Sequence, residues 1–521
     1  MPGIRSSTRR LLAELRSMRR RHQIEEGDWI NSLYKAYLTV IVGVVALIYL
    51  SPFFGSGHVS ESALADIDAH GAAIVGVGVA IAIALGLRSG TRGGPLAPEP
   101  PDVLYVLLAP LDRGTALRGM ALRQLRGVAF IAVVAGAVGG TIALIRIPDD
   151  GAAWIAVGVG LGLAVTVAAW GAALVASGTR CAPWVATAVG LALIAWSVAD
   201  VLFDAETSPT TQLGRVGLWP REFSAAGVVG LVVALLLPVA GLAVAGGVSL
   251  ETADRRARLV GQLRFAATLQ DVRTVMVLHR QLAQEGSRVR PWHRISASGT
   301  RLGGCWRRDW QGIVRWPVAR VLRAVGLSTI AGLALVGAWK GTSLLVVVAG
   351  AALFVAALDA AEGLASETDN IERPAGFPVR WGRLVLRHLA APLVVVAFVE
   401  LPALGVFVAL TESRDAALVA LLSLAVAVLA APIGAATLLV LGTPSADKGF
   451  GYGMPELGSL LMLARQTGPA VLVVGAVAPV AIYARSGPDV RAVVTAVAIA
   501  FVGAILAGVA GWLGSRTLEP R

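Results

Sequence analysis

The sequence predicts an all-α polytopic membrane protein with about twelve transmembrane helices, arranged as two pseudo-equivalent six-helix halves. Composition, the apolar runs and the charges between those runs all point to this fold class. Of 521 residues, 56% are hydrophobic and only 15% are charged, whereas soluble domains have about 25% charged residues. The mean hydropathy is +0.72. This composition argues against a water-soluble enzyme.

The apolar runs are long enough to cross a bilayer, which requires about 20 mostly apolar residues in a helix. The candidate spans are Tyr34–Phe54, Gly71–Leu87, Gly127–Ile145, Ala153–Ala176, Trp184–Phe203, Phe223–Val248, Val325–Trp339, Ser343–Leu358, Leu389–Leu410, Ala416–Leu441, Pro469–Ala484 and Ala492–Leu513. The seventh and eighth are short and are separated only by residues 340–342. A re-entrant hairpin is therefore an alternative for that pair.

The segments between the runs alternate in charge. Residues 1–33 and 88–126 are rich in arginine, while residues 55–70 carry acidic side chains and no Lys or Arg. Basic segments stay on the cytoplasmic side, so an even number of spans places both termini in the cytoplasm of a bacterial cell. We attribute the net charge of +12 to topology and to contacts with anionic lipid headgroups. No nucleic-acid partner is expected.

The same features divide the chain into five parts. Residues 1–33 form an amphipathic cytoplasmic lead-in, 34–250 a first six-span half, 251–320 a basic cytoplasmic linker, 321–513 a second six-span half and 514–521 a cytoplasmic tail. Apolar residues recur at helical spacing in 251–285, which predicts one or two amphipathic helices there. That linker is either a docking or membrane-surface element or a solvated connection.

A distinctive cytoplasmic segment follows the second span. Glu99 stands eleven residues before Pro110, the leucine-rich stretch between them includes Leu107 and Leu108, and Arg113 follows. We expect the arginines beyond the proline to lie on a helix across the membrane face.

A related segment follows the eighth span. Glu367 stands eleven residues before Pro378, and Arg380 comes next. Because both segments follow the second span of their half, the simplest explanation is a tandem duplication in parallel orientation.

No catalytic signature is present. The chain lacks a phosphate-binding G-x-x-x-x-G-K-[ST] loop, an H-E-x-x-H pair and a C-x-x-C pair. We therefore expect no enzymatic activity, no cofactor and no metal in this chain. Cys181 and Cys305 fall in segments predicted to be cytoplasmic, so we expect no disulfide.

Ionisable residues are scarce in the predicted spans. Asp200 and Asp359 fall near helix ends, where we expect water. Glu400 falls in the middle of the ninth span, two residues before Pro402. A carboxylate there costs at least about 2.5 kcal/mol on insertion scales, so its side chain should face the bundle or a wet cavity. Glu400 is our candidate for an intramembrane pathway residue.

This organisation resembles the permease of export-type ATP-binding-cassette (ABC) transporters. In that family, a cytoplasmic segment with an acidic residue, leucines, proline and arginine forms a coupling helix. The resemblance implies that Glu99, Leu107, Leu108, Pro110 and Arg113 couple to a cytoplasmic ABC ATPase. It implies the same for Glu367, Pro378 and Arg380 of the second segment. The chain would then contain both halves of a permease, served by two ATPase copies.

Two other interpretations remain open from the residues alone. In the first, the chain is a secondary transporter and Glu400 binds the coupling proton. In the second, it is a non-transporting membrane scaffold or a lipid-modifying enzyme without a recognisable site.

Overall fold

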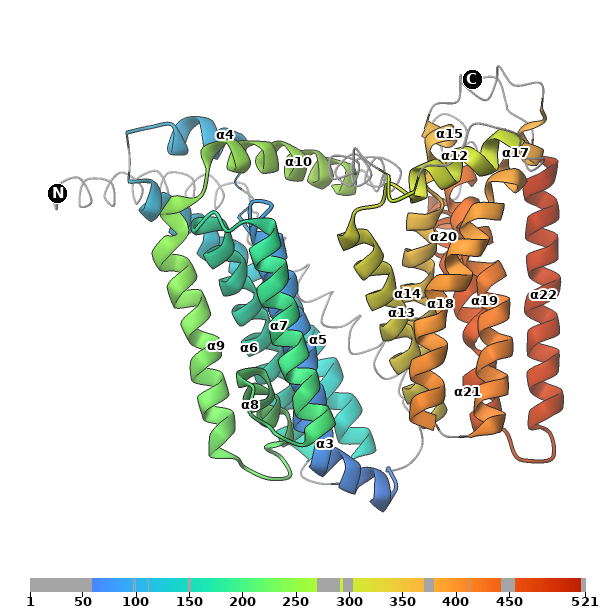
Figure 1. The fold of residues 1–521 in the computed structure, drawn as a ribbon, viewed down its shortest axis with the longest axis horizontal. Helices are drawn as coiled ribbons and strands as arrows, with labels where there is room; N and C mark the ends of the chain where they lie inside the picture. The colour runs from blue at the N-terminus through green and yellow to red at the C-terminus, as the bar shows by residue number, and fades with distance from the viewer. Residues whose placement is uncertain are drawn as a thin grey trace. The chain divides into compact units, whose positions relative to one another are not determined.

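The computed structural model describes residues 59–96, 98, 100–110, 112–148, 151–268, 291–293, 303–369, 379–411, 413–441 and 455–516, and every regular element in these ranges is helical (Figure 1). Nine of the described helices are long and apolar enough to cross a membrane, and two bent helix pairs raise that number to as many as eleven. The all-helical polytopic prediction is therefore confirmed in these ranges. The first predicted span, 34–54, lies outside the described residues, so the total of twelve stays a prediction.

The chain forms two compact units, which divide between Phe265 and Ala266, within the predicted linker. The spanning helices of the first unit are α3 (Glu61–Gly90), α5 (Arg113–Arg146), α6 (Gly151–Gly178), α7 (Pro183–Phe203) and α9 (Ala225–Val244). In this unit α6 packs against α3, α5 and α9. A methyl group added at Gly136 of α5 or Gly158 of α6 would lie 2.4 Å from the other residue's carbonyl oxygen. Glycine at both positions therefore permits this close crossing.

Two helices of the first unit extend well beyond the predicted spans. α3 begins at Glu61 and α5 at Arg113, ten and fourteen residues before the predicted starts. The expectation of an arginine-bearing helix lying across the membrane face is wrong here, because residues 113–126 continue directly into the span. Arg118 on this extension donates to the carbonyls of Leu242 and Ala243, at 2.7 and 3.1 Å, near the last turn of α9.

A short helix, α8 (Pro209–Arg215), connects α7 to α9 and packs against α3 and α9. Asp200, which we expected near water, is buried and anchors this connection. Its carboxylate accepts hydrogen bonds from Thr207 N and Oγ1, both at 2.9 Å, and from Ser208 N at 2.8 Å. Asp200 is thus a structural residue.

The second unit contains the described helices from α12 onward. Its members are α12 (Gly303–Ile313), α13 (Val318–Trp339), α14 (Leu345–Ala360), α15 (Glu362–Asp369), α17 (Trp381–His388), α18 (Ala390–Thr411), α19 (Arg414–Leu441), α20 (Pro455–Val477), α21 (Pro479–Arg485) and α22 (Arg491–Ser515). The seventh predicted span lies within helix α13, and the eighth corresponds to α14, which is followed by α15 after a bend of 64°. The stretch 464–485, which includes α21, is bent by 46°.

The packing order is similar in part between the two units. In the first unit α6 packs against α3, α5 and α9, and in the second unit α19 packs against the corresponding helices α14, α18 and α22. α14 packs against α20 as α3 packs against α7, whereas the contact of α19 with α20 has no comparable counterpart between α6 and α7. These helices occupy corresponding places in the predicted six-plus-six order. The pattern agrees with a duplication, which stays a prediction.

Candidate functional site

The first predicted coupling segment is a compact, two-sided turn at one end of the first unit (Figure 1). It consists of α4 (Pro100–Asp102) and a π-helical turn, Val103–Leu107, closed by a 3.2 Å hydrogen bond from Leu108 N to Val103 O. Such π turns are rare and frequently occur at functional sites.

The inner side of this segment is part of an apolar cluster. Val103 and Leu107 are buried there with Leu117 of α5 and Leu174 of α6. The linker helix α10 (Leu250–Thr268) contributes Ala257 to the same cluster. The predicted amphipathic helix is therefore present up to residue 268, and its first turns contribute to the same apolar cluster as the coupling segment.

The outer side of the segment exposes large apolar side chains. Leu104, Tyr105 and Leu108 are all exposed, and Leu108 retains 60% of its accessible surface whereas Leu107 retains none. Pro110 and Arg113, farther along, are also exposed. Of the residues predicted to couple in this half, Leu108, Pro110 and Arg113 are accessible to a partner and Leu107 is not. Glu99 lies outside the described residues.

The second predicted coupling segment is described only at its two ends. Glu367 lies in α15, and Arg380 is exposed immediately before α17. Pro378 lies outside the described residues. Glu367 is only 1% exposed and forms an ion pair with Arg308 of α12, whose Nη2 donates to Ser366 Oγ at 3.2 Å. A side chain so enclosed can position its neighbours but offers no surface to a partner.

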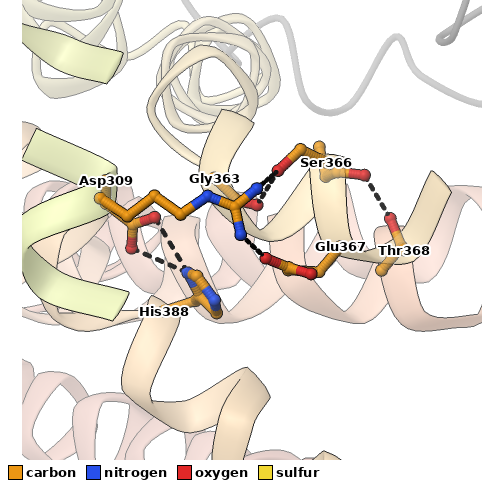
Figure 2. A network of polar contacts seen from close by, with 8 residues as sticks. Asp309, Gly363, Ser366, Glu367, Thr368 and His388 are labelled. Carbon is orange, nitrogen blue, oxygen red and sulfur yellow. Dashed lines mark hydrogen bonds and ion pairs between the residues drawn. The ribbon is translucent and has the colours of Figure 1, made fainter. Parts of the chain in front are cut away.

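A pair that is buried on both sides lies beside the Arg308–Glu367 pair (Figure 2). His388 Nδ1, at the end of α17, is 2.9 Å from both carboxylate oxygens of Asp309 on α12, and both side chains are buried. A methyl group added at Gly363 of α15 would lie only 1.9 Å from Asp309 Oδ1, so glycine permits this approach. We call the pairs Arg308–Glu367 and Asp309–His388 the α12 clamp, since together they attach α12 to α15 and α17.

The sequence interpretation missed Arg308, Asp309 and His388 as members of a site. One signal was available. Asp309 stands four residues from both Cys305 and Ile313, two residues that pack on the apolar core. A carboxylate within an apolar helical stripe requires a buried partner.

The chain's two cysteines are both free thiols. Burial raises the pKa of the Cys305 thiol, and the carboxylates of Asp309 and Glu367 raise it further. A thiol with a raised pKa is a poor nucleophile at neutral pH, because the thiolate is the reactive form.

Glu400 lies in the interior of the second unit, as predicted. It is the eleventh of the 22 residues of α18 and is 3% exposed. Within the described residues, neither of its carboxyl oxygens has a hydrogen-bond partner. Three residues later, Ala403 N donates to Ser328 Oγ of α13 at 3.0 Å.

Comparisons with family models, with curated proteins and with solved structures give no match for this chain. Among the described residues, no three His, Cys, Asp or Glu side chains form a group that could hold a metal ion. Inferences about function therefore depend on the geometry of the coupling segment, the α12 clamp and Glu400.

Proposed function

We propose that this chain is the membrane-spanning permease subunit of an ABC-type exporter, energised by separate cytoplasmic ATPase subunits. The main support is the outer side of the coupling segment, where Leu104, Tyr105 and Leu108 are exposed. Contiguous exposed apolar side chains on a rigid turn are typical of protein interfaces. The bacterial plasma membrane, the cytoplasmic termini and the two ATPase copies are parts of the same proposal.

The inner side of the segment explains how a docked ATPase moves the spans. Val103 and Leu107 share a buried apolar cluster with side chains of α5, α6 and α10, so a force applied at Leu108 is transmitted to two spanning helices through this cluster. In the second unit, the α12 clamp attaches α12 to both helices that flank the segment 370–378. We propose that Glu367 acts there as a positioning residue and that Arg380 contacts the partner.

The proposal is tested with the ABC ATPase encoded nearest to this chain's gene, co-expressed with the full-length protein. Leu108→Ser removes an exposed apolar side chain from the segment. Leu202→Ser is the matched control, because Leu202 is similarly exposed but lies at the opposite end of the first unit, near the end of α7. Both variants are compared at equal membrane abundance for ATPase copurification and for stimulated ATP hydrolysis.

We expect Leu108→Ser to weaken association by about tenfold, equivalent to about 1.4 kcal/mol, as for an interface hot spot, and Leu202→Ser to have no effect. Equal ATPase binding by both variants would refute the docking surface. Transport that continues without the ATPase and depends on a proton gradient would favour the secondary transporter. A chain that binds the ATPase but moves no solute under either condition would favour the scaffold interpretation.

A further inference from the structure

An acidic side chain without a partner lies deep in the second unit. Glu400 is ten residues from the start of α18 and eleven from its end, which corresponds to about 15 Å of helix on either side at about 1.5 Å per residue. The carboxyl group is enclosed, and the described residues provide it with neither a donor nor a cation.

The charged groups on the surrounding helices are directed elsewhere. α18 packs against α12, α13, α14, α17 and α19. The titratable residues of these five helices are Cys305, Arg307, Arg308, Asp309, Arg320, Arg323, Asp359, Arg383, Arg387, His388, Arg414 and Asp415. They lie in the short helices α12 and α17 or in the end turns of the spans. Arg308 and Asp309 are paired with Glu367 and His388 in the α12 clamp. The other ion pairs are Arg320–Glu362, Arg323–Asp359 and Arg491–Asp415.

The backbone near Glu400 supplies a polar group at the same depth. Pro402 has no N–H, so the carbonyl of Phe398 lacks its usual intrahelical donor. Ser423 of α19 is fully buried, and its hydroxyl has no partner among the described residues. Since α18 and α19 are packed neighbours joined by residues 412–413, helical rise places Ser423 within about 3 Å of the depth of Glu400.

These observations favour a neutral carboxylic acid. An ionised carboxylate in such surroundings costs several kcal/mol unless it is paired, whereas a neutral acid retains only the smaller cost of a polar group. A metal cation such as Ca²⁺ requires six or more oxygen ligands, and among the described residues Glu400 does not belong to any group of three His, Cys, Asp or Glu side chains that could hold a metal ion. A proton needs only the carboxylate oxygen itself.

We propose that Glu400 is a proton-binding site in the second unit, occupied at neutral pH and released only when a conformational change admits water to the middle of α18. This inference does not depend on the ATPase. A permease driven by ATP and a transporter driven by a proton gradient would both contain the same protonated carboxyl.

The test uses dicyclohexylcarbodiimide on membranes that contain the full chain. The carboxylic proton moves to a carbodiimide nitrogen while the carboxyl oxygen adds to the central carbon, so the reaction requires the protonated acid. The matched control within the same chain is Glu367, which is equally buried but paired with Arg308. Labelling is read by mass spectrometry of the peptides that contain each residue. Glu400→Gln is the variant that removes the reacting group.

We expect Glu400 to be labelled at least about tenfold faster than Glu367 at pH 7, and the labelling to decline as the pH is raised. Infrared spectroscopy of the same membranes provides a second measurement: the carboxylic C=O band of the parent chain should be absent from Glu400→Gln. That band decides the result where the reagent does not reach the site. If the spectra of parent and variant show no such difference, Glu400 is ionised and the proposal fails. Protection of Glu400 by Na⁺ or K⁺ at constant pH would also overturn it, because the bound ion would then be a metal cation.

Discussion

Replacing Glu367 by Gln removes one charge of the α12 clamp while keeping the shape of the side chain. Removing one partner of a fully buried ion pair costs about 3–5 kcal/mol, whereas an exposed pair contributes about 0–1 kcal/mol. Here Glu367 is 1% exposed but the side chain of Arg308 remains 37% exposed, so water can solvate part of the guanidinium. We therefore expect the free energy of detaching α12 to fall by about 2 kcal/mol, between these two limits.

Amide hydrogen exchange of the peptide that covers α12 measures this free energy directly, with the protein in lipid nanodiscs. A loss of about 2 kcal/mol corresponds to exchange about 25- to 30-fold faster, since 1.4 kcal/mol is a factor of ten. Peptides from α10 in the first unit serve as the internal control and should exchange at the parent rate. The double variant Arg308→Gln with Glu367→Gln should lose less than the sum of the two single variants, because each already breaks the same pair.

Two results would refute the reasoning. Exchange of α12 within about twofold of the parent would mean that the pair contributes under about 0.5 kcal/mol, as for an exposed pair. Strict additivity of the two single variants would mean that Arg308 and Glu367 do not interact energetically.

Three other predictions concern local packing and charge. Gly363→Ala should destabilise the second unit by about 1–3 kcal/mol, because the added methyl group would overlap Asp309. The control Gly304→Ala, where the added methyl group has open space, should leave the melting temperature in detergent unchanged. Equal melting temperatures for the two variants would contradict this prediction. The rate of Cys305 alkylation by iodoacetamide should rise with pH to a midpoint above that of free cysteine, about 8.5, because burial raises the thiol pKa; a midpoint at or below 8.5 would show that the thiol is not buried as described. Asp200→Ala removes the acceptor of the buried Ser208 N–H and should lower stability by about 1–3 kcal/mol, whereas the exposed Thr207 N–H can bond to water instead; an unchanged unfolding midpoint would show that water also replaces the carboxylate at Ser208.

The apolar runs predicted the cores of the described spans well, and they predicted some of the ends but not others. The start of α7 was predicted within one residue, because Pro183 begins the helix where the apolar run begins. The starts of α3 and α5 were missed by ten or more residues. Both helices begin before the apolar run, at Glu61 in α3 and at Arg113 in α5. Hydropathy detects only apolar residues, so it misses helical turns made of polar and charged residues.

The site was predictable only where a single residue carries the signal. Glu400 was identified because one carboxyl interrupts an apolar run, and its burial follows from that position. Leu107 and Leu108 look alike in the sequence, and only the π-helical turn places one inside and the other outside. The burial of Glu367 depends on Arg308, which is 59 residues away, and no local pattern reveals a partner at that distance.

The position of α10 determines where this chain can be divided. Ala253 and Ala257 belong to the same buried apolar cluster as Val103 and Leu107, so these turns of α10 belong to the interior of the first unit. If the chain were cut after residue 250, one fragment would expose the apolar cluster around Val103 and Leu107, and α10 would belong to the other fragment. A break after residue 268 would leave all of α10 with the first unit, which would then keep this set of core side chains in one polypeptide.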